Sequence, residues 1–282
     1  MVLYGAVAVL GLAVGSFLNV VIHRLPEMLR RRWYSECQAL LESGNAGSGA
    51  APATERYDLI HPPSTCPHCG HRIRPWENVP LLSYALLRGR CRACKGRISL
   101  RYPVVEALTA TASVAVVWQL GATPQAVAAL LLTWILVGLA FIDLDTQLLP
   151  DVMTLPLLWA GLVVNLQGLF VPLREAVLGA MAGYLVLWSV YQLFRLVTGK
   201  EGMGYGDFKL LAALGAWLGW KALPLIVILS AAVGAAVGVG LMAAGRLQRS
   251  NPIPYGPFLA AAGWITLLWG TAISRAWLGF AP

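Results

Sequence analysis

Residues 124–142 have the sequence PQAVAALLLTWILVGLAFI, and Asp143 follows directly. The segment contains no charged residue and is long enough to cross a bilayer, since a spanning helix needs about 20 mostly apolar residues. An ionisable side chain at the end of such a segment is costly to bury and usually has a function. This stretch therefore predicts a membrane helix and marks a first candidate for a chemical site.

Similar apolar segments recur along the chain. The chain is 58% hydrophobic and 12% charged, with a mean hydropathy of +0.67, whereas soluble domains carry about 25% charged residues. We therefore predict an all-α polytopic membrane protein. About eight transmembrane helices are expected, near residues 2–22, 103–120, 124–142, 152–170, 175–197, 208–220, 222–244 and 256–274. The sixth segment is short, and we expect it to be tilted or to end partway through the bilayer.

Basic residues set the predicted orientation. Residues 23–101 contain 13 of the 21 Lys and Arg residues against 6 acidic ones, which accounts for +7 of the net charge of +8. Because positive charge concentrates in cytoplasmic loops, this loop is expected inside the cell, and the charge needs no nucleic-acid partner. No basic residue precedes the apolar run that ends at Ile22, so we expect this span to be retained rather than cleaved as a signal peptide.

The chain divides into three predicted regions. These are residues 1–22 as the first transmembrane helix, residues 23–101 as a cytoplasmic loop with a zinc module, and residues 102–282 as a seven-helix membrane domain. Within the loop, residues 42–58 are rich in Gly, Ala and Ser and are predicted to be flexible. Residues 61–101 are dense in Pro, Cys and Arg, which favours a compact module.

Four cysteines form two knuckles, Cys66-Pro-His-Cys69 and Cys91-Arg-Ala-Cys94. Each C-x2-C turn supplies two thiolates, and two such turns can close a tetrahedral sulfur site that suits zinc. Four thiolates leave no open coordination position, so we expect a structural metal rather than a catalytic one.

Alternatives exist for this cluster. Two disulfides would use the same four residues, although a reducing cytoplasm disfavours them. His68 or His71, which flank the first knuckle, could replace one sulfur ligand. Cys37 lies outside the pattern, and we expect an ordinary free thiol there.

Two carboxylates stand where predicted spans end or begin. Asp143 closes the third span and Asp207 opens the sixth, so the topology places both at the cytoplasmic membrane face. Two facing carboxylates share one proton, because both cannot stay ionised at close range. The ionised member can deprotonate a water while the protonated member donates to a scissile carbonyl oxygen. The pair therefore predicts a hydrolase that needs no metal, with Asp145 as a supporting residue or a solvated charge.

Nearby groups have simpler explanations. Asp207 follows Gly204-Tyr-Gly206, whose glycines permit unusual backbone conformations and close approach of a substrate; an ordinary turn with an N-capping Asp is the alternative. Asp151 precedes the fourth span and is expected to be an N-cap. Glu106 lies about a turn into the second span and is expected to pair with Arg101.

These features together resemble the bacterial prepilin peptidases, the type IV leader peptidases. The resemblance covers nearly the whole chain. It rests on GSFLNVVIHRLP (15–26), the two knuckles with RPWENVP (74–80) between them, RYP (101–103) with Glu106, IDLDTQLLPD (142–151) and GMGYGDFK (202–209). It implies that Asp143 and Asp207 are the catalytic aspartates. It also implies a bacterial inner-membrane enzyme that cuts the short basic leader of type IV prepilins or type II secretion pseudopilins on the cytoplasmic side.

The resemblance implies a second activity. Many members methylate the new N-terminal amine with S-adenosylmethionine, and those members carry a cysteine-bearing loop as this chain does. No glycine-rich nucleotide motif follows a predicted strand. The cofactor-binding residues therefore stay unassigned, and Gly89-Arg90-Cys91 are candidates only by their place in the loop.

Other classes of protein share some of these features. A polytopic cation transporter could bind an ion with the membrane-edge aspartates, although broken mid-membrane helices are not evident. A scaffold that docks through the zinc module would explain the cysteines but not the aspartates. A presenilin-type protease would share the Gly-x-Gly-Asp motif, but the eight predicted spans and the cysteine loop weigh against it.

Overall fold

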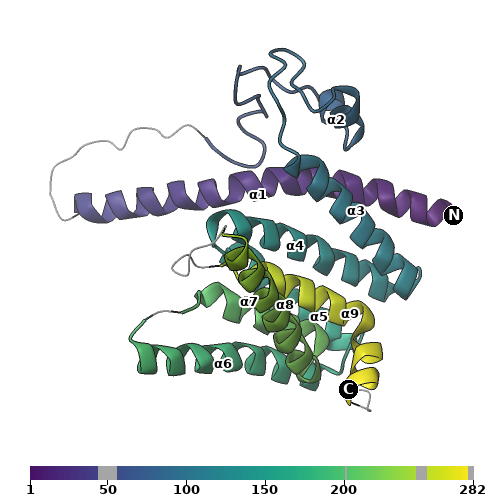
Figure 1. Cartoon of the computed structure of the whole chain (residues 1–282), viewed down its shortest axis with the longest axis vertical. Coiled ribbons are helices and arrows are strands. Elements are labelled where there is room, and N and C mark those ends of the chain that lie inside the picture. The colour runs from purple at the N-terminus through teal and green to yellow at the C-terminus, as the bar shows by residue number, and fades with distance from the viewer. Residues whose placement is uncertain (44–55, 201, 246–252, 279–282) are drawn as a thin grey trace. The chain divides into compact units, whose positions relative to one another are not determined.

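The computed structural model describes residues 1–43, 56–200, 202–245 and 253–278 (Figure 1). In this part of the chain all regular structure is helical, with two isolated β-bridges and no strand, so the all-α prediction is confirmed. The chain forms two compact units, Met1–Thr111 and the part from Ala112 onward. Helix α3 (Arg101–Leu120) contributes to both.

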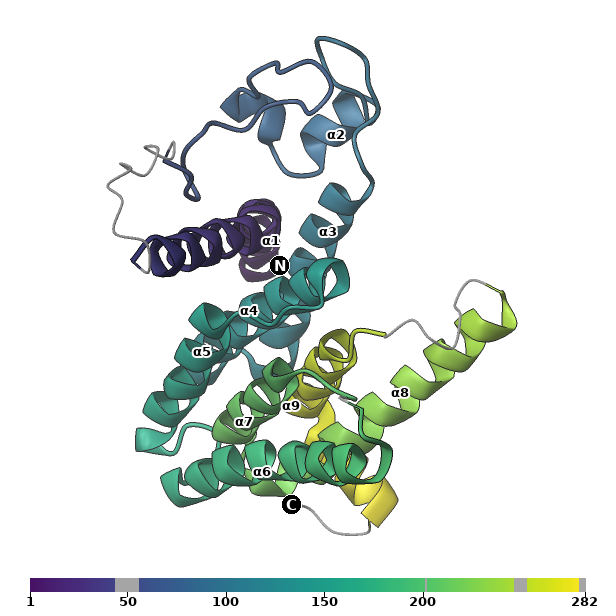
Figure 2. The same ribbon diagram turned by 90° about the vertical axis from the view of Figure 1, so that its left-hand side faces the viewer.

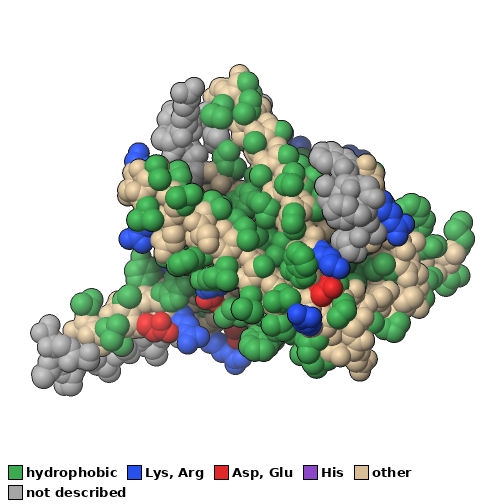
Figure 3. All heavy atoms as spheres, turned by 90° about the horizontal axis from the view of Figure 1, so that it is seen from below, with side chains coloured by type: hydrophobic (Ala, Val, Ile, Leu, Met, Phe, Trp, Pro, Cys, Tyr) green, Lys and Arg blue, Asp and Glu red, His purple; other side chains and the backbone are tan. Residues whose placement is uncertain are grey.

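Six helices in the described ranges are long and apolar enough to cross a membrane. They are α1 (Val2–Ser43), α3, α4 (Pro124–Thr146), α6 (Leu173–Thr198), α8 (Leu223–Ala243) and α9 (Gly256–Leu278). Figure 3 shows one face on which hydrophobic side chains predominate and charged ones are few. The chain is therefore a multi-pass membrane protein.

The other two predicted spans form shorter helices. They are α5 (Asp151–Val164), extended by the 3-10 turn η2 (Asn165–Gln167), and α7 (Tyr205–Leu218). A further turn, η3 (Trp220–Ala222), joins α7 to α8. Eight helices thus coincide with the eight predicted segments, while eight complete crossings stay a prediction.

Helix α1 does not end with the first predicted span. It continues to Ser43, so the region from residue 23, which we assigned to a loop, begins as helix. Residues 27–43 are rich in helix-forming Glu, Leu and Arg, and Arg31 pairs with Glu27 at i,i+4 spacing with an N–O distance of 2.9 Å. Most of the stretch predicted to be flexible, residues 44–55, lies outside the described residues.

In the first unit, α1 and α3 approach closely at Gly15. A Cβ atom there would lie 2.7 Å from the Glu106 Cα, so no larger residue fits. Close crossings at small residues are typical of membrane helices. The Asn19 amide donates to the Tyr102 carbonyl at 3.1 Å and fixes the same crossing.

Helix α7 forms the centre of the second unit and packs against α5, α6 and α9 (Figures 1 and 2). A 14-residue helix is about 21 Å long, shorter than the roughly 30 Å hydrocarbon core. Its side chains from Leu210 to Trp217 are nevertheless all buried, because neighbouring helices enclose it. At the crossing with α6, a Cβ on Gly215 would overlap the Gly179 carbonyl, so both glycines permit contact between backbones. The short sixth segment is therefore surrounded by protein rather than by lipid.

Buried hydrogen bonds fix α5 to the end of α7. The Trp217 indole N–H donates to the Leu157 carbonyl at 2.8 Å. The Asn165 amide donates to the carbonyls of Ala216 and Trp217 at 2.9 and 3.0 Å. These contacts satisfy polar groups that are costly to leave unpaired in an apolar interior.

Candidate functional site

Asp143 and Asp207 come together within the second unit. Asp143 lies in the last turn of α4 and Asp207 in the first turn of α7. Both residues are buried, with 5% and 8% of their surface exposed. Each carboxylate lies within electrostatic range of the other. Two helix ends from distant parts of the sequence thus present a pair of buried carboxyl groups.

Asp143 receives a hydrogen bond from a third segment. The Gly256 N–H, at the start of α9, donates to Asp143 Oδ2 at 3.0 Å. A Cβ on Gly256 would lie 2.6 Å from that oxygen, so a residue with a side chain does not fit. Sequence reasoning did not single out Gly256. Its only signal is the Pro-Tyr-Gly-Pro turn of residues 254–257, directly before the last apolar segment.

Asp207 is not an N-cap. Gly204 occupies the N-cap of α7, and Asp207 is the third residue of the helix. Asp207 Oδ1 is buried and accepts no hydrogen bond from any residue that the structure describes. Since buried polar atoms are rarely left without a partner, this unpaired oxygen marks Asp207 as a candidate functional residue.

The two glycines before Asp207 serve different purposes. Gly204 has φ −79°, and a Cβ there would meet only Asp207 Oδ2, at 4.0 Å, so the expected unusual conformation is wrong at this position. A Cβ on Gly206 would lie 2.6 Å from the Leu149 Cβ. Leu149 also contacts the Gly256 position, where a Cβ would lie 3.3 Å from its Cδ1. Leu149 therefore packs between the start of α7, which carries Asp207, and the start of α9, which contacts Asp143.

The N-cap prediction for Asp151 is wrong. Pro150 is the N-cap of α5, and Asp151 is its first residue. Its carboxylate accepts two hydrogen bonds from Lys209 Nζ, at 2.7 and 2.8 Å, because α5 and α7 begin side by side. Asp145 is exposed, in contrast to Asp143.

The four cysteines of the first unit form a cluster. Their Sγ atoms all lie within 4.8 Å of one another, and those of Cys66 and Cys94 are 3.9 Å apart. Zinc with four sulfur ligands at about 2.3 Å requires sulfur atoms about 3.8 Å apart, so the cluster fits this metal. All four are free thiols rather than two disulfides.

The two knuckles repeat one backbone pattern. The Cys66 N–H donates to the His71 carbonyl at 2.9 Å, and the Cys91 N–H donates to the Gly96 carbonyl at 2.8 Å. Each turn contains one residue in the left-handed region, Gly70 with φ 70° and Lys95 with φ 59°. The paired turns explain how two short sequence motifs converge on one centre.

Backbone N–H groups favour the ionised form of two of the four thiols, whereas, despite the His71 N–H, burial and the neighbouring thiols raise the pKa of Cys69 to about 11. The N–H groups of His68 and Cys69 lower the pKa of Cys66 to about 7. Those of Cys94 and Ala93 lower the pKa of Cys91 in the same way. Hydrogen bonds to the charged form stabilise it, and thiolates are the form that coordinates zinc.

No histidine belongs to the metal-binding group found in the described residues. His71 Nε2 instead lies 3.2 Å from Glu77 Oε2. The exchange of a sulfur ligand for a histidine is therefore not supported. Cys37 is exposed and free, as expected.

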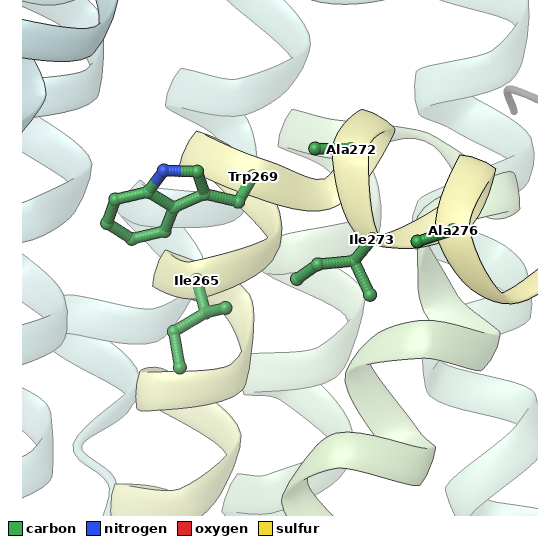
Figure 4. Close-up of a pocket in the computed structure, with 5 residues that line it drawn as sticks. All are labelled: Ile265, Trp269, Ala272, Ile273 and Ala276. Carbon is green, nitrogen blue, oxygen red and sulfur yellow. The ribbon is translucent and has the colours of Figure 1, made fainter.

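A separate hollow of about 420 Å³ lies on α9 (Figure 4). It is lined by Ile265, Trp269, Ala272, Ile273 and Ala276. None of these side chains can act as an acid, a base or a metal ligand. The hollow is therefore not a chemical site, and the carboxylate pair and the cysteine cluster remain as the two candidates.

Both candidate sites lie in regions of the chain that match known protein families. A model of the bacterial peptidase A24 N-terminal domain matches residues 9–120, and one of the type IV leader peptidase family matches residues 130–239. Relatives named prepilin leader peptidase/N-methyltransferase are similar over nearly their full length. The one from Aeromonas hydrophila is 58% identical over 275 residues (98% of this chain and 93% of that protein). The one from Pseudomonas aeruginosa is 57% identical over 272 residues (96% and 92%).

No solved structure matches the chain. The first family model contains the cysteine cluster, and the second contains both aspartates. The agreement with the relatives extends through both units of the fold. Its relatives in these comparisons are named prepilin leader peptidase/N-methyltransferase. The chain is thus an enzyme and belongs to the type IV leader peptidase family, a family of proteases.

Proposed function

We propose that the chain is a membrane aspartyl endopeptidase in which Asp143 and Asp207 form the catalytic pair. Its substrates are type IV prepilins or pseudopilins, whose short basic leader it cuts at the cytoplasmic face of the bacterial inner membrane. The observation that carries this proposal is the convergence of two buried carboxylates, one of which has an oxygen without a hydrogen-bond partner among the described residues.

The contacts of the two carboxylates favour one division of roles. The Gly256 N–H stabilises negative charge on Asp143, so we assign Asp143 as the ionised base and Asp207 as the protonated acid. Asp143 takes a proton from water as the water oxygen attacks the scissile carbonyl carbon, and Asp207 gives its proton to the carbonyl oxygen. The C–N bond then breaks as the proton on Asp143 passes to the leaving amine, while one hydroxyl of the tetrahedral intermediate returns its proton to Asp207 and becomes the carbonyl oxygen of the new acid.

The topology of the proposal follows the basic residues. Residues 1–22 cross the membrane first, residues 23–101 form the loop on the cytoplasmic side that carries the zinc module, and residues 102–282 form a seven-helix membrane domain. The 13 Lys and Arg residues in residues 23–101 support this orientation. A prepilin is itself a membrane helix, so a cut near the membrane boundary requires carboxylates held at the same depth.

The second activity is N-methylation of the new N-terminus. Relatives named for both activities support it. S-adenosylmethionine would supply the methyl group, and its binding residues stay unassigned. Cys66, Cys69, Cys91 and Cys94 are proposed to hold a structural zinc ion, which their sulfur spacing supports.

Leader cleavage by the purified protein tests the assignment. The protein in nanodiscs is incubated with a model prepilin, with and without S-adenosylmethionine, and the products are weighed by mass spectrometry. Asp143→Ala and Asp207→Ala should each reduce cleavage by about 10³-fold or more, because each removes one proton-transfer group. Asp145→Ala, an exposed neighbour, is the matched control and should cleave normally.

Two results would overturn the proposal. Full processing of the prepilin by either Asp143→Ala or Asp207→Ala would show that the two aspartates are not the catalytic pair. Cation flux through reconstituted protein that cleaves no prepilin would instead support a transporter. A gain of one methyl mass after cleavage, dependent on S-adenosylmethionine, tests the second activity separately.

A further inference from the structure

An apolar surface in the first unit has no part in the proposed reaction. It lies on residues 75–87, which contain the turn η1 (Pro75–Asn78) and the short helix α2 (Leu82–Leu86). Four side chains of this segment are exposed: Trp76 (60%), Val79 (41%), Leu82 (56%) and Leu86 (73%). Leu82 and Leu86 share one helix face. Exposed apolar side chains gathered in one segment mark a contact surface.

The depth of this segment is set by a contact with α3. The Leu81 N–H donates to Glu106 Oε2 at 2.8 Å, and Ser16 of α1 also hydrogen-bonds Glu106. The sequence predicts Arg101 as the partner of Glu106, whereas these two residues are its partners in the structure. Glu106 lies against Gly15 at the crossing of α1 and α3.

Gly15 is well inside the membrane span of α1. It precedes Ile22, where the apolar run ends, by about 10 Å along the helix at roughly 1.5 Å per residue. The start of α2 therefore lies at the level where α1 and α3 are already within the bilayer, although it belongs to a region that the sequence assigned to the cytoplasm.

The backbone of the segment is suited to an apolar environment. Ser83 is buried, and its hydroxyl donates to the Trp76 carbonyl at 2.9 Å and accepts from the Val79 N–H at 3.0 Å. The Ser83 N–H in turn donates to the Val79 carbonyl at 3.0 Å. In lipid, backbone polar groups must be paired within the protein, and these groups are. The turn thus satisfies its own polar groups while its apolar side chains project outward.

Charge identifies the partner. Residues 56–101 contain nine Lys and Arg residues against two acidic ones. Arg74 lies over the Trp76 ring at 5.4 Å, and the exposed residues Arg88 and Arg90 follow the segment. Tryptophan at the level of the headgroups and basic residues that attract anionic lipids are typical of membrane interfaces.

We propose that Trp76, Val79, Leu82 and Leu86 insert their side chains into the headgroup and acyl boundary of the bilayer that α1 and α3 cross. The cysteine module is then docked on the membrane surface, with anionic lipid as its partner. This inference depends on the contacts within the first unit and is independent of the catalytic assignment.

Ile60 provides a matched control in the same unit. It is 74% exposed, close to the value for Leu86. Its segment is held by the Arg24 guanidinium, which donates to the carbonyls of Asp58 and Pro62 at 2.9 and 2.6 Å. Arg24 lies about 13 Å further along α1 than Gly15, at roughly 1.5 Å per residue, and beyond the apolar run. Ile60 therefore matches Leu86 in exposure and differs from it in depth.

Site-specific photo-crosslinking in the full chain tests the proposal. A diazirine amino acid replaces Leu86, Leu82, Ile60 or Leu10, an exposed residue of the α1 span (47%) that serves as the positive control. Each variant is placed in nanodiscs of phosphatidylethanolamine and phosphatidylglycerol, irradiated and analysed by mass spectrometry. Metal content and monodispersity establish folding without reference to cleavage.

We expect lipid adducts at Leu86 and Leu82 in yields comparable with that at Leu10. At Ile60 the yield of lipid adducts should be far lower. Absence of lipid adducts at both positions in α2, with normal adducts at Leu10, would overturn the proposal. So would crosslinks from these positions to peptides of the chain's own second unit, which would identify a protein interface. A failure of leader cleavage would bear only on the catalytic assignment.

Discussion

The cysteine cluster and the carboxylate pair are assembled in opposite ways. The four thiols come from two short turns that repeat one hydrogen-bond pattern, so the local backbone presents each pair of sulfur atoms. The carboxylates come from the ends of α4 and α7, and a third helix, α9, contacts one of them. In the proposed zinc site a metal would join the two halves, whereas tertiary contacts of buried helices assemble the second site. The chain thus combines a site that is locally encoded with one that exists only in the complete fold.

Metal removal should affect the two sites very unequally. Structural zinc in small domains contributes about 10–16 kcal/mol of apparent binding energy, so its loss should open the cysteine module. We expect hydrogen–deuterium exchange at the Cys66 and Cys91 amides to rise by about 100-fold or more after chelation, while buried α7 amides stay protected. Equal acceleration in α7 would show that the two sites are not assembled independently. Restoration of protection by added zinc is the control for irreversible damage.

A single methyl group should disturb the carboxylate pair. Gly256→Ala would place its Cβ 2.6 Å from Asp143 Oδ2 and displace the hydrogen-bonding N–H. A displacement of about 1 Å at a catalytic group can cost about 100-fold in rate, so kcat for leader cleavage should fall by about that factor. Gly204→Ala is the matched control, since its Cβ would meet only Asp207 Oδ2, at 4.0 Å, and its activity should be nearly unchanged. Equal activity of both variants would mean that the Gly256 contact does not position Asp143.

The pH dependence of zinc binding should show the effect of the backbone N–H groups on the cysteine thiols. Backbone N–H groups of His68 and Cys69 lower the pKa of Cys66 to about 7 from 9.0. The thiolate is therefore present above pH 7 and is lost as the pH falls through that value. Below pH 7, zinc must also displace the Cys66 proton, so its apparent affinity should fall by about a further tenfold per pH unit. Competition titrations with a chelator should show a steeper slope below pH 7, and one constant slope across it would contradict the prediction.

The same contrast explains how much of the molecule could be predicted from sequence. The cysteine cluster and the helical segments were predictable, because C-x2-C spacing and long apolar runs are local signals. Asp143 and Asp207 required a topology argument, since only the fold brings α4 and α7 together.

The failures came from contacts between distant segments. Asp151 was predicted as an N-cap because its sequence context is that of a helix start, while its partner Lys209 belongs to another helix. Gly256 was missed because nothing near it in sequence indicates that its N–H meets Asp143. The length of α1 was underestimated because charge was taken to end the helix, whereas i,i+4 pairs such as Arg31–Glu27 support its continuation.

The smallest predicted effect distinguishes the two knuckles from each other. Gly70 and Lys95 occupy equivalent left-handed positions, with φ values of 70° and 59°. A residue with a side chain is destabilised by roughly 1–2 kcal/mol in the left-handed conformation. Glycine avoids this cost, but it loses more conformational entropy on folding, which offsets about 0.5–1 kcal/mol of the stability gained. The net difference is at most about 1.5 kcal/mol, so Lys95→Gly should slow zinc release into excess chelator by up to about tenfold, and Gly70→Ala should accelerate it by a similar factor. A Cβ on Gly70 would contact nothing within 4 Å, so its effect is conformational alone.

Lys95→Asn separates conformation from charge in this comparison. Asparagine tolerates the left-handed region better than lysine and is uncharged, so a purely conformational effect places its release rate between those of the native protein and Lys95→Gly. If loss of the positive charge near the thiolates dominates instead, both Lys95 variants should release zinc faster than the native protein. The order of the three rates thus decides whether the second knuckle is limited by its backbone, as the repeated hydrogen-bond pattern indicates, or by electrostatic support of its sulfur ligands.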